Sequence, residues 1–219
     1  MPSAKTTARL DAVTLDAMGT LVDLVDPVEP LRAALRERGV EASADDVRAA
    51  FAAEVAYYIP RGHEGRDEKS LQDLGRACAG VFLGHLGAGL DPAEFAPAFV
   101  GSLRLQPLAG VQEALAALRR AGLSLACVSN WDVSLHDQLL RAEVAQHLDA
   151  VVSSAEARAP KPAPDPFLLA LARLEVTPER TVHVGDGEAD REGASAAGIR
   201  FEPAPVATLP ERLGLRLGA

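Results

Sequence analysis

The sequence predicts an α/β fold, in which a parallel β-sheet lies between layers of helices and a block of helices is inserted after the first strand. Three observations predict it. A short apolar strand pattern covers residues 12–16 and stops before a glycine and a threonine. Residues 25–103 have apolar side chains at helical spacing almost throughout. From about residue 105 onward, strand patterns alternate with helical ones, which is typical of parallel sheets with right-handed crossovers.

The inserted block, called the helical insertion below, is expected to contain four helices. Gly39 follows the first apolar repeat and is a residue type that commonly ends a helix. Ser43 precedes Asp46 by three residues, a spacing that resembles a capping box and predicts the start of the second helix. The four helices are expected over residues 30–38, 43–58, 70–86 and 91–103.

The chain after the insertion is expected to supply the other strands and the helices that cover them. The strands are expected over residues 123–128, 150–152, 181–184 and 199–201. The helices are expected over residues 111–119, 134–146, 166–174 and 190–197. Leu115 and Leu118 mark the buried face of the first of these helices. Thr177 and Pro178 resemble a helix N-cap followed by proline at the first helical position.

Composition narrows the class of protein. The chain has 219 residues, 48% hydrophobic and 24% charged, which excludes a disordered chain. Its net charge of −9 argues against a nucleic-acid partner, because phosphate contacts need a basic surface. No apolar run approaches the ~18 residues of a membrane span, and residues 1–9 lack a signal-peptide core. Cys78 and Cys127 are expected to be reduced core residues, so the sequence predicts a cytoplasmic protein without a membrane partner.

Polar residues follow the predicted strands at their carboxyl ends, where open α/β sheets bind ligands. Asp16 follows the first strand, Ser129 and Asn130 follow the strand at 123–128, and Asp186 follows the strand at 181–184. Taken singly, each is explained as well by a turn or a helix cap. Lys161, which lies among prolines, would usually be a solvated loop residue. Together, however, they match a family pattern.

Four segments resemble, in order and spacing, the four motifs of the haloacid dehalogenase (HAD) superfamily. They are residues 15–21 (LDAMGTL), 128–130 (VSN), 161–162 (KP) and 185–194 (GDGEADREGA). The resemblance covers essentially the whole chain and implies a three-layer α/β/α, Rossmann-like core. This family places its smaller cap domain directly after the first motif. The resemblance therefore implies a core domain of residues 1–23 and 104–219, with residues 24–103 as a helical cap.

The resemblance further implies a hydrolase with an aspartyl nucleophile and a small, phosphorylated substrate. Asp16 has the nucleophile's position, and a carboxylate that attacks phosphorus splits one difficult displacement into two easier ones. Lys161 would offset negative charge, and the Ser129 hydroxyl would bind a phosphoryl oxygen. The backbone N–H groups expected near the transferred group are those of Gly19, Thr20 and Asn130.

The family pattern also implies an Mg²⁺ ion. It places this ion on the carboxylates of Asp16 and Asp186 and on the backbone carbonyl of Met18, with Asp190 as a direct or supporting ligand. Three carboxylates packed together would otherwise repel one another and raise each other's pKa, so the residues themselves favour a cation. The histidines show no ligand spacing, and His183 is expected to be an ordinary strand residue.

Met18 departs from the pattern of most phosphatases in the superfamily, which have a second Asp at this position as general acid and base. That role commonly contributes ~10²–10⁴ in rate. Three alternatives stay open: a 2-haloacid dehalogenase, a phosphonate-cleaving hydrolase, and a non-catalytic phosphate-binding or interaction protein. Dehalogenases of this family use no metal and lack the carboxylate that Asp186 supplies here. Phosphonate cleavage would need a lysine from the insertion, where Lys69 is the only one and has the context of an exposed helix.

A polar run (YYIPRGHEGRD) joins the second and third helices of the insertion. It is explained equally well as a plain connection or as a substrate loop that closes over the core site. In the second interpretation Arg61 and His63, with Arg66, contact an anion. Trp131 and Asp132, directly after the second motif, are candidates for the entrance to the site, although Trp131 also suits packing between domains.

Overall fold

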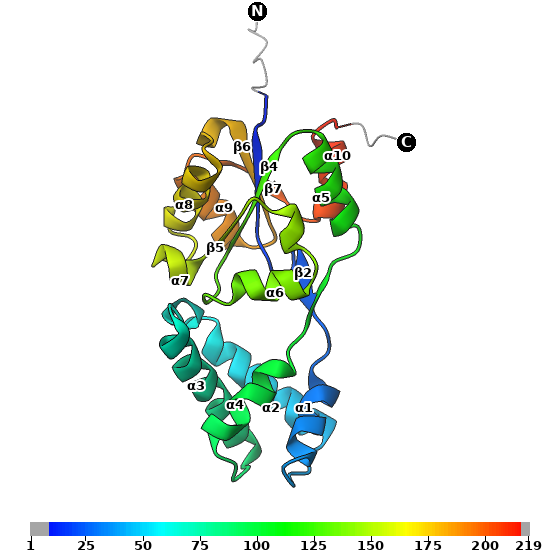
Figure 1. Ribbon diagram of the computed structural model, residues 1–219, viewed down its shortest axis with the longest axis vertical. Coiled ribbons are helices and arrows are strands. Elements are labelled where there is room, and N and C mark those ends of the chain that lie inside the picture. Colours follow the sequence, from blue (N-terminus) through cyan, green and yellow to red (C-terminus); the bar gives the residue numbers. More distant parts are fainter. Residues whose placement is uncertain (1–8, 216–219) are drawn as a thin grey trace, which may run out of the picture.

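The computed structural model describes residues 9–215 and confirms the α/β class predicted from the sequence (Figure 1). Five parallel strands form one sheet in the order β5-β4-β1-β6-β7. Their bounds are Ala12–Leu15 (β1), Ser124–Ser129 (β4), Ala150–Ser153 (β5), Thr181–Gly185 (β6) and Arg200–Pro203 (β7). Along the chain, β4 and β5 are added on one side of β1, and β6 and β7 are then added on the other side. The topological switch point, where such sheets bind ligands, therefore falls at β1.

Helices cover both faces of this sheet. Their bounds are Val111–Arg120 (α5), Leu135–Arg141 (α6), Ser154–Ala157 (α7), Asp165–Leu174 (α8), Glu188–Ala196 (α9) and Leu209–Arg212 (α10). Successive strand residues point to opposite faces, so each strand contributes to two cores. In β4, Leu125 and Cys127 pack with α5, α6 and α10, whereas Ala126 and Val128 pack with α8 and α9. These two buried layers hold the sheet between its helices.

The helical insertion lies at the carboxyl end of β1 and connects to the sheet through a two-stranded ribbon (Figure 1). The ribbon pairs β2 (Val22–Leu24) with β3 (Leu105–Pro107) in antiparallel register. Its helices are Val28–Arg36 (α1), Ala44–Tyr58 (α2), Glu68–Leu86 (α3) and Pro92–Gly101 (α4). They enclose a separate apolar core in which the rings of Phe82, Phe95 and Phe99 lie 5.2–6.4 Å apart, centroid to centroid.

Most predicted elements are present, and the predicted cap of α2 is confirmed, since the backbone N–H of Asp46 donates to Ser43 Oγ at 3.1 Å. One predicted helix is wrong in its extent. Residues 134–146 form α6 and a separate 3₁₀ turn, Ala145–His147 (η2), because Glu143 adopts a left-handed conformation with φ of 56°. That conformation ends an α-helix. The N-cap expected at Thr177 precedes a 3₁₀ turn, Pro178–Arg180 (η3), instead of an α-helix. The Thr177 side chain makes no cap hydrogen bond.

Six short elements were not expected from the sequence. They are the helices α7 and α10, the 3₁₀ turns Gly62–Glu64 (η1) and Val206–Thr208 (η4), and the strands β2 and β3 of the ribbon. Each spans only three or four residues, too few for a periodic pattern to be recognised. Cys78 and Cys127 are buried and unpaired, as predicted. Residues 1–8, on which most of the expected absence of a signal peptide rests, lie outside the described residues.

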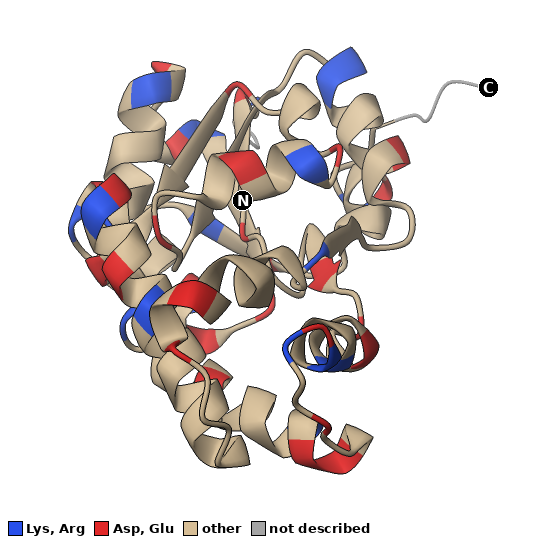
Figure 2. Ribbon diagram, turned by 60° about the horizontal axis from the view of Figure 1, so that its bottom comes forward, with Lys and Arg blue, Asp and Glu red and all other residues tan. Residues whose placement is uncertain are grey.

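Surface charge contributes little to holding these elements together. Figure 2 shows Lys and Arg scattered among Asp and Glu over the helices. Exposed pairs such as Arg48–Asp45 and Lys69–Asp73 join residues one turn apart on the same helix, where solvent screens the attraction and leaves it weak. No described helix combines the length and the apolar character needed to cross a bilayer. Stability therefore comes mainly from the three apolar cores.

The separation of these cores gives a first prediction. Phe82→Ala should cost about 3–5 kcal/mol, because it removes a fully buried ring from the core of the insertion. Hydrogen exchange should then show faster opening of α1–α4, while β1, β4 and β6 keep their protection. Leu168→Ala, at a half-exposed position of α8, is the matched control and should leave both regions unchanged. Equal loss of protection in the sheet would contradict independent cores.

Candidate active site

The predicted site residues converge at the carboxyl ends of β1, β4 and β6, on the side of the sheet that faces the insertion (Figure 1). Asp16 follows β1, and its backbone N–H donates to Val184 O of β6 at 2.9 Å. Ser129 is the last residue of β4, and Asp186 follows β6. The parallel register of three neighbouring strands thus brings together residues that are far apart in the chain.

Lys161 is buried and uses all three hydrogens of its ammonium group. Nζ donates to Asp16 Oδ1 at 2.6 Å, to Asp190 Oδ1 at 2.6 Å and to the carbonyl of Val128 at 2.9 Å. Burial alone would lower the pKa of Lys161, but the charges of Asp16 and Asp190 outweigh that effect and raise it. The lysine is therefore charged and fixed, as a group that offsets the charge of a nucleophile must be.

Asp16 has one oxygen that is held and one that is free. Its Oδ1 accepts from Lys161 and also from the hydroxyl of Ser129, at 2.9 Å. Its Oδ2 has no hydrogen-bond partner within residues 9–215. The Ser129 hydroxyl, expected to bind a phosphoryl oxygen, donates here to the carboxylate instead. These bonds orient Asp16 and leave a lone pair available for attack.

Asn130 has a role that the sequence did not suggest. Its side-chain Nδ2 donates to the carbonyl of Lys161 at 3.0 Å, and its Oδ1 accepts from the backbone N–H of Lys161 at 2.7 Å. Two reciprocal bonds hold the backbone from which the lysine extends. From the sequence, the backbone N–H of Asn130 was expected to donate to the substrate. Asn130 and Lys161 are 31 positions apart in the chain, so no local pattern could have predicted the contact between them.

Three carboxylates form the one group of residues in the described structure that could hold a metal ion. One oxygen of each of Asp16, Asp186 and Asp190 lies within 4.8 Å of the others. Burial, and next the negative charge of Asp16, raise the pKa of Asp186. Gly19 makes the approach of Asp186 feasible: its φ is +74°, and an added Cβ would lie 2.3 Å from Asp186 Oδ2. Hard oxygen donors with excess negative charge fit the Mg²⁺ that the resemblance implies.

The turn after β1 holds the remaining residues expected at the phosphoryl group. Gly19 N donates to Val22 O at 2.9 Å, and Thr20 N donates to Ala17 O at 3.3 Å, so both amides bond within the turn. The buried hydroxyl of Thr20 has no partner among the residues described here. Met18 is half-buried and forms a bridge with Val22. It stays a prediction that these amides donate hydrogen bonds to a phosphoryl group. It also stays a prediction that the Met18 carbonyl binds a metal ion.

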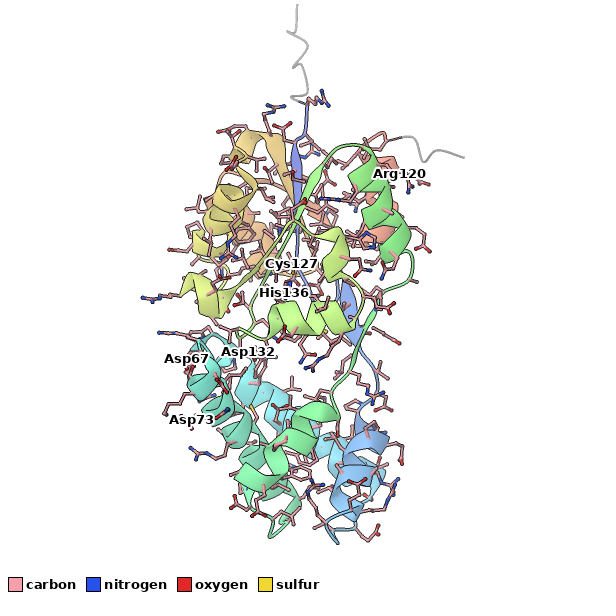
Figure 3. All side chains as sticks on the ribbon, in the orientation of Figure 1. Asp67, Asp73, Arg120, Cys127, Asp132 and His136 are labelled. Atoms are coloured by element: carbon pink, nitrogen blue, oxygen red, sulfur yellow. The ribbon has the colours of Figure 1, made fainter. Side chains whose placement is uncertain are left out.

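The predicted substrate loop contacts the core beside the second motif. Tyr58 donates its hydroxyl hydrogen to Asp132 Oδ2 at 2.9 Å, and the backbone N–H of Val133 donates to Gly65 O at 2.9 Å. Figure 3 shows Asp132 at the junction of the core and the insertion. Burial, followed by the charge of Asp132, raises the pKa of Tyr58 well above its ordinary value. Asp132 is thus a buried contact of the insertion rather than part of an open entrance.

The basic residues of the loop diverge. Arg61 stacks over the ring of Tyr57, 4.2 Å from its centroid, and donates to the Tyr57 carbonyl at 3.0 Å. Arg66 donates to His63 O at 3.2 Å and lines a cavity of about 710 Å³ next to α6 and α7. None of the three carboxylates lines that cavity. Arg66 therefore lies apart from the acidic site, whereas the predicted substrate contacts of Arg61 and His63 stay untested.

Comparison with known proteins places these observations in a family. The model for haloacid dehalogenase-like hydrolases matches residues 10–198. The mouse (Mus musculus) haloacid dehalogenase-like hydrolase domain-containing protein 3 is 40% identical over 95 residues, which are 43% of this chain and 38% of that protein. A phosphoglycolate phosphatase of Nitrosospira multiformis is 43% identical over 90 residues, 41% of this chain and 40% of that protein. The matches thus span about two fifths of the length of these relatives.

Among solved structures, L-2-haloacid dehalogenase from Xanthobacter autotrophicus is 28% identical, with a TM-score of 0.63, over 95% of this chain and 84% of that chain. Similar proteins therefore include both phosphatase-named and dehalogenase-named enzymes. The family match begins before Asp16 and ends beyond Asp190, so it includes every residue of the acidic site. With the whole site inside that match, this chain belongs to the haloacid dehalogenase-like hydrolases.

Proposed function

We propose that this hydrolase is an Mg²⁺-dependent phosphatase for a small phosphorylated metabolite, with Asp16 as its nucleophile. We also propose residues 1–23 and 104–219 as the core domain and 24–103 as its cap. The observation that carries the proposal is the acidic cluster: three carboxylates lie together with only one buried ammonium group among them. Such a cluster needs a cation, and metal-dependent phosphate transfer is the chemistry of this family that uses one. The phosphatase-named relative supports this choice.

In the proposed reaction, Asp16 attacks phosphorus with its free oxygen. The new O–P bond forms as the bond from phosphorus to the leaving oxygen breaks, which gives an aspartyl-phosphate that water then hydrolyses. Lys161 and Ser129 hold the other oxygen, so the carboxylate keeps the orientation needed for attack. Asp16, Asp186 and Asp190 would hold Mg²⁺, with the Met18 carbonyl as a further ligand. The bound ion would offset the negative charge of the carboxylates and the phosphoryl group.

Met18 determines which substrates such a site can process well. Its side chain can neither protonate a leaving alkoxide nor take a proton from water. Substrates with good leaving groups, such as acyl or aryl phosphates, do not need the first of these steps. We therefore expect the physiological substrate to have an activated leaving group or to supply its own proton.

A 2-haloacid dehalogenase is the second candidate, and Met18 is the observation that favours it. Halide leaves carbon without protonation, so a dehalogenase needs no acid at that position. In that reaction Asp16 would form an ester bond to carbon as the carbon–halogen bond breaks. The acidic cluster argues against this candidate, because a metal-free reaction gains nothing from Asp186. Phosphate release that EDTA abolishes would support a phosphatase, whereas halide release that EDTA leaves unchanged would support a dehalogenase.

Calorimetry with Mg²⁺ tests the metal site directly. Asp186→Ala should weaken Mg²⁺ binding by more than the ~10–100-fold that loss of a supporting residue commonly costs, because a direct ligand is removed. Asp137→Ala, at an exposed position of α6, removes the same charge outside the cluster and should bind Mg²⁺ like the wild type. Equal affinity in all three proteins would rule out the proposed site.

A substrate comparison tests the interpretation of Met18. The wild type should release phosphate from aryl phosphates much faster than from alkyl phosphates. Met18→Asp should raise alkyl phosphate hydrolysis by up to ~10²–10⁴, because it restores a group that can transfer protons. Met18→Leu keeps the apolar volume and should give no gain. A wild type that is already fast on alkyl phosphates would show that another residue supplies the proton.

The predicted substrate loop is tested by steady-state kinetics. Arg61→Ala and His63→Ala should raise KM or lower kcat in variants that circular dichroism shows to be folded at the assay temperature, since both side chains are half-buried and their loss can also affect stability. Lys69→Ala is the matched control, because Lys69 is an exposed cation on α3 that pairs with Asp73. Kinetics that match the control for both variants would identify the loop as a plain connection.

A further inference from the structure

A chain of buried hydrogen bonds runs from the middle of the sheet to the nucleophile. Thr14 Oγ1 of β1 lies 2.9 Å from His183 Nδ1 of β6. His183 Nε2 lies 3.0 Å from Asp190 Oδ1, the same oxygen that accepts from Lys161 Nζ at 2.6 Å. Lys161 in turn donates to Asp16. His183, expected from the sequence to be an ordinary strand residue, is thus three hydrogen bonds away from Asp16.

The hydrogen positions in this chain follow from its chemistry. The carboxylate of Asp190 is only an acceptor, so His183 must carry a hydrogen on Nε2. Thr14 Oγ1 can donate to Nδ1 or accept from it, so both ring nitrogens have a partner when Nε2 donates to Asp190.

The surroundings leave His183 little freedom. The ring is fully buried and meets Phe167 edge to face, with centroids 4.8 Å apart and an interplanar angle of 86°. Asp190 is similarly confined, since a Cβ added at Gly185 would lie 2.4 Å from its Cγ. On this face of the sheet β4 presents the apolar side chains of Ala126 and Val128. An imidazole there costs desolvation that an apolar residue would not, and both its nitrogens are satisfied only through Thr14 and Asp190.

We propose that His183 is a positioning residue of the active site: through Asp190 it fixes where Lys161 and the metal-binding carboxylates stand. Asp190 accepts two bonds on Oδ1, from His183 and from Lys161, and two donors from different elements define the plane of the carboxylate. This inference deepens the proposed function and rests on it for the identity of the metal. A purely structural role, in which His183 only joins β6 to α9, would change stability without changing metal affinity.

Matched variants separate these two roles. His183→Leu removes the donor to Asp190, whereas His183→Gln keeps an N–H group that can reach the same oxygen. His183→Leu should weaken Mg²⁺ binding by ~10–100-fold and lower kcat on an aryl phosphate, with little change in KM. His183→Gln should recover most of both. Wild-type Mg²⁺ affinity in a folded His183→Leu protein, or equal losses in the two variants, would overturn the proposal.

A spectroscopic measurement tests the bond from His183 to Asp190 without turnover and without a variant that could fail to fold. Nitrogen-15 NMR of labelled histidine in the wild type should show a hydrogen on Nε2 of His183, the nitrogen that faces Asp190. A His183 without a hydrogen on Nε2 would overturn the proposal. A wild type that binds no Mg²⁺ and releases no phosphate would instead refute the proposed function, and the Nε2 hydrogen would still test the bond to Asp190.

Discussion

The ammonium group of Lys161, shared between Asp16 and Asp190, is the interaction on which the rest of the site depends. Both bonds are 2.6 Å long, and the lysine side chain is 4% exposed. Removing one partner of a buried ion pair typically costs 3–5 kcal/mol, because the remaining charge is left without compensation. The end of β1, the Lys161 loop and the start of α9 must therefore come together for the core to be stable. The stability of the sheet and the orientation of Asp16 are two results of the same contacts.

The acidic residues of the site affect stability in opposite directions. Burial opposes ionisation of Asp190, but bonds from His183 and Lys161 prevail and lower its pKa, so its contribution is present above the unfolded value of 3.8 and lost as pH falls. Asp186 has its pKa raised by burial and by Asp16, so ionising it at neutral pH costs stability. A cation bound there would remove that cost, and binding to the folded state alone stabilises a protein. Ionised Asp186 thus lowers the stability of the folded protein, and a bound metal ion would restore that stability.

The sequence predicted what local patterns encode. The alternation of strand and helix patterns predicted the parallel sheet. The polar residues at the ends of its strands predicted Asp16, Ser129 and Asp186 as site residues. It did not predict the ribbon of β2 and β3, whose three-residue strands pair across the whole insertion. Nor did it predict the contacts of Asn130 and His183, since these arise only when distant segments pack. A signal for His183 did exist: it lies between Val182 and Val184 in a fully buried strand, where an imidazole needs partners.

The residue at position 18 affects the charge of the site and the role that the insertion can have. A fourth carboxylate at position 18 would add negative charge beside three acids that already exceed the single ammonium group, and like charges repel. Methionine avoids that cost, and in the proposed phosphatase the proton would then come from the substrate or the insertion. The insertion contacts the core through Tyr58–Asp132 and Gly65–Val133, next to the Asn130 that holds the Lys161 backbone. One short segment after β4 therefore links the position of the insertion to the backbone of Lys161, which in turn holds Asp16.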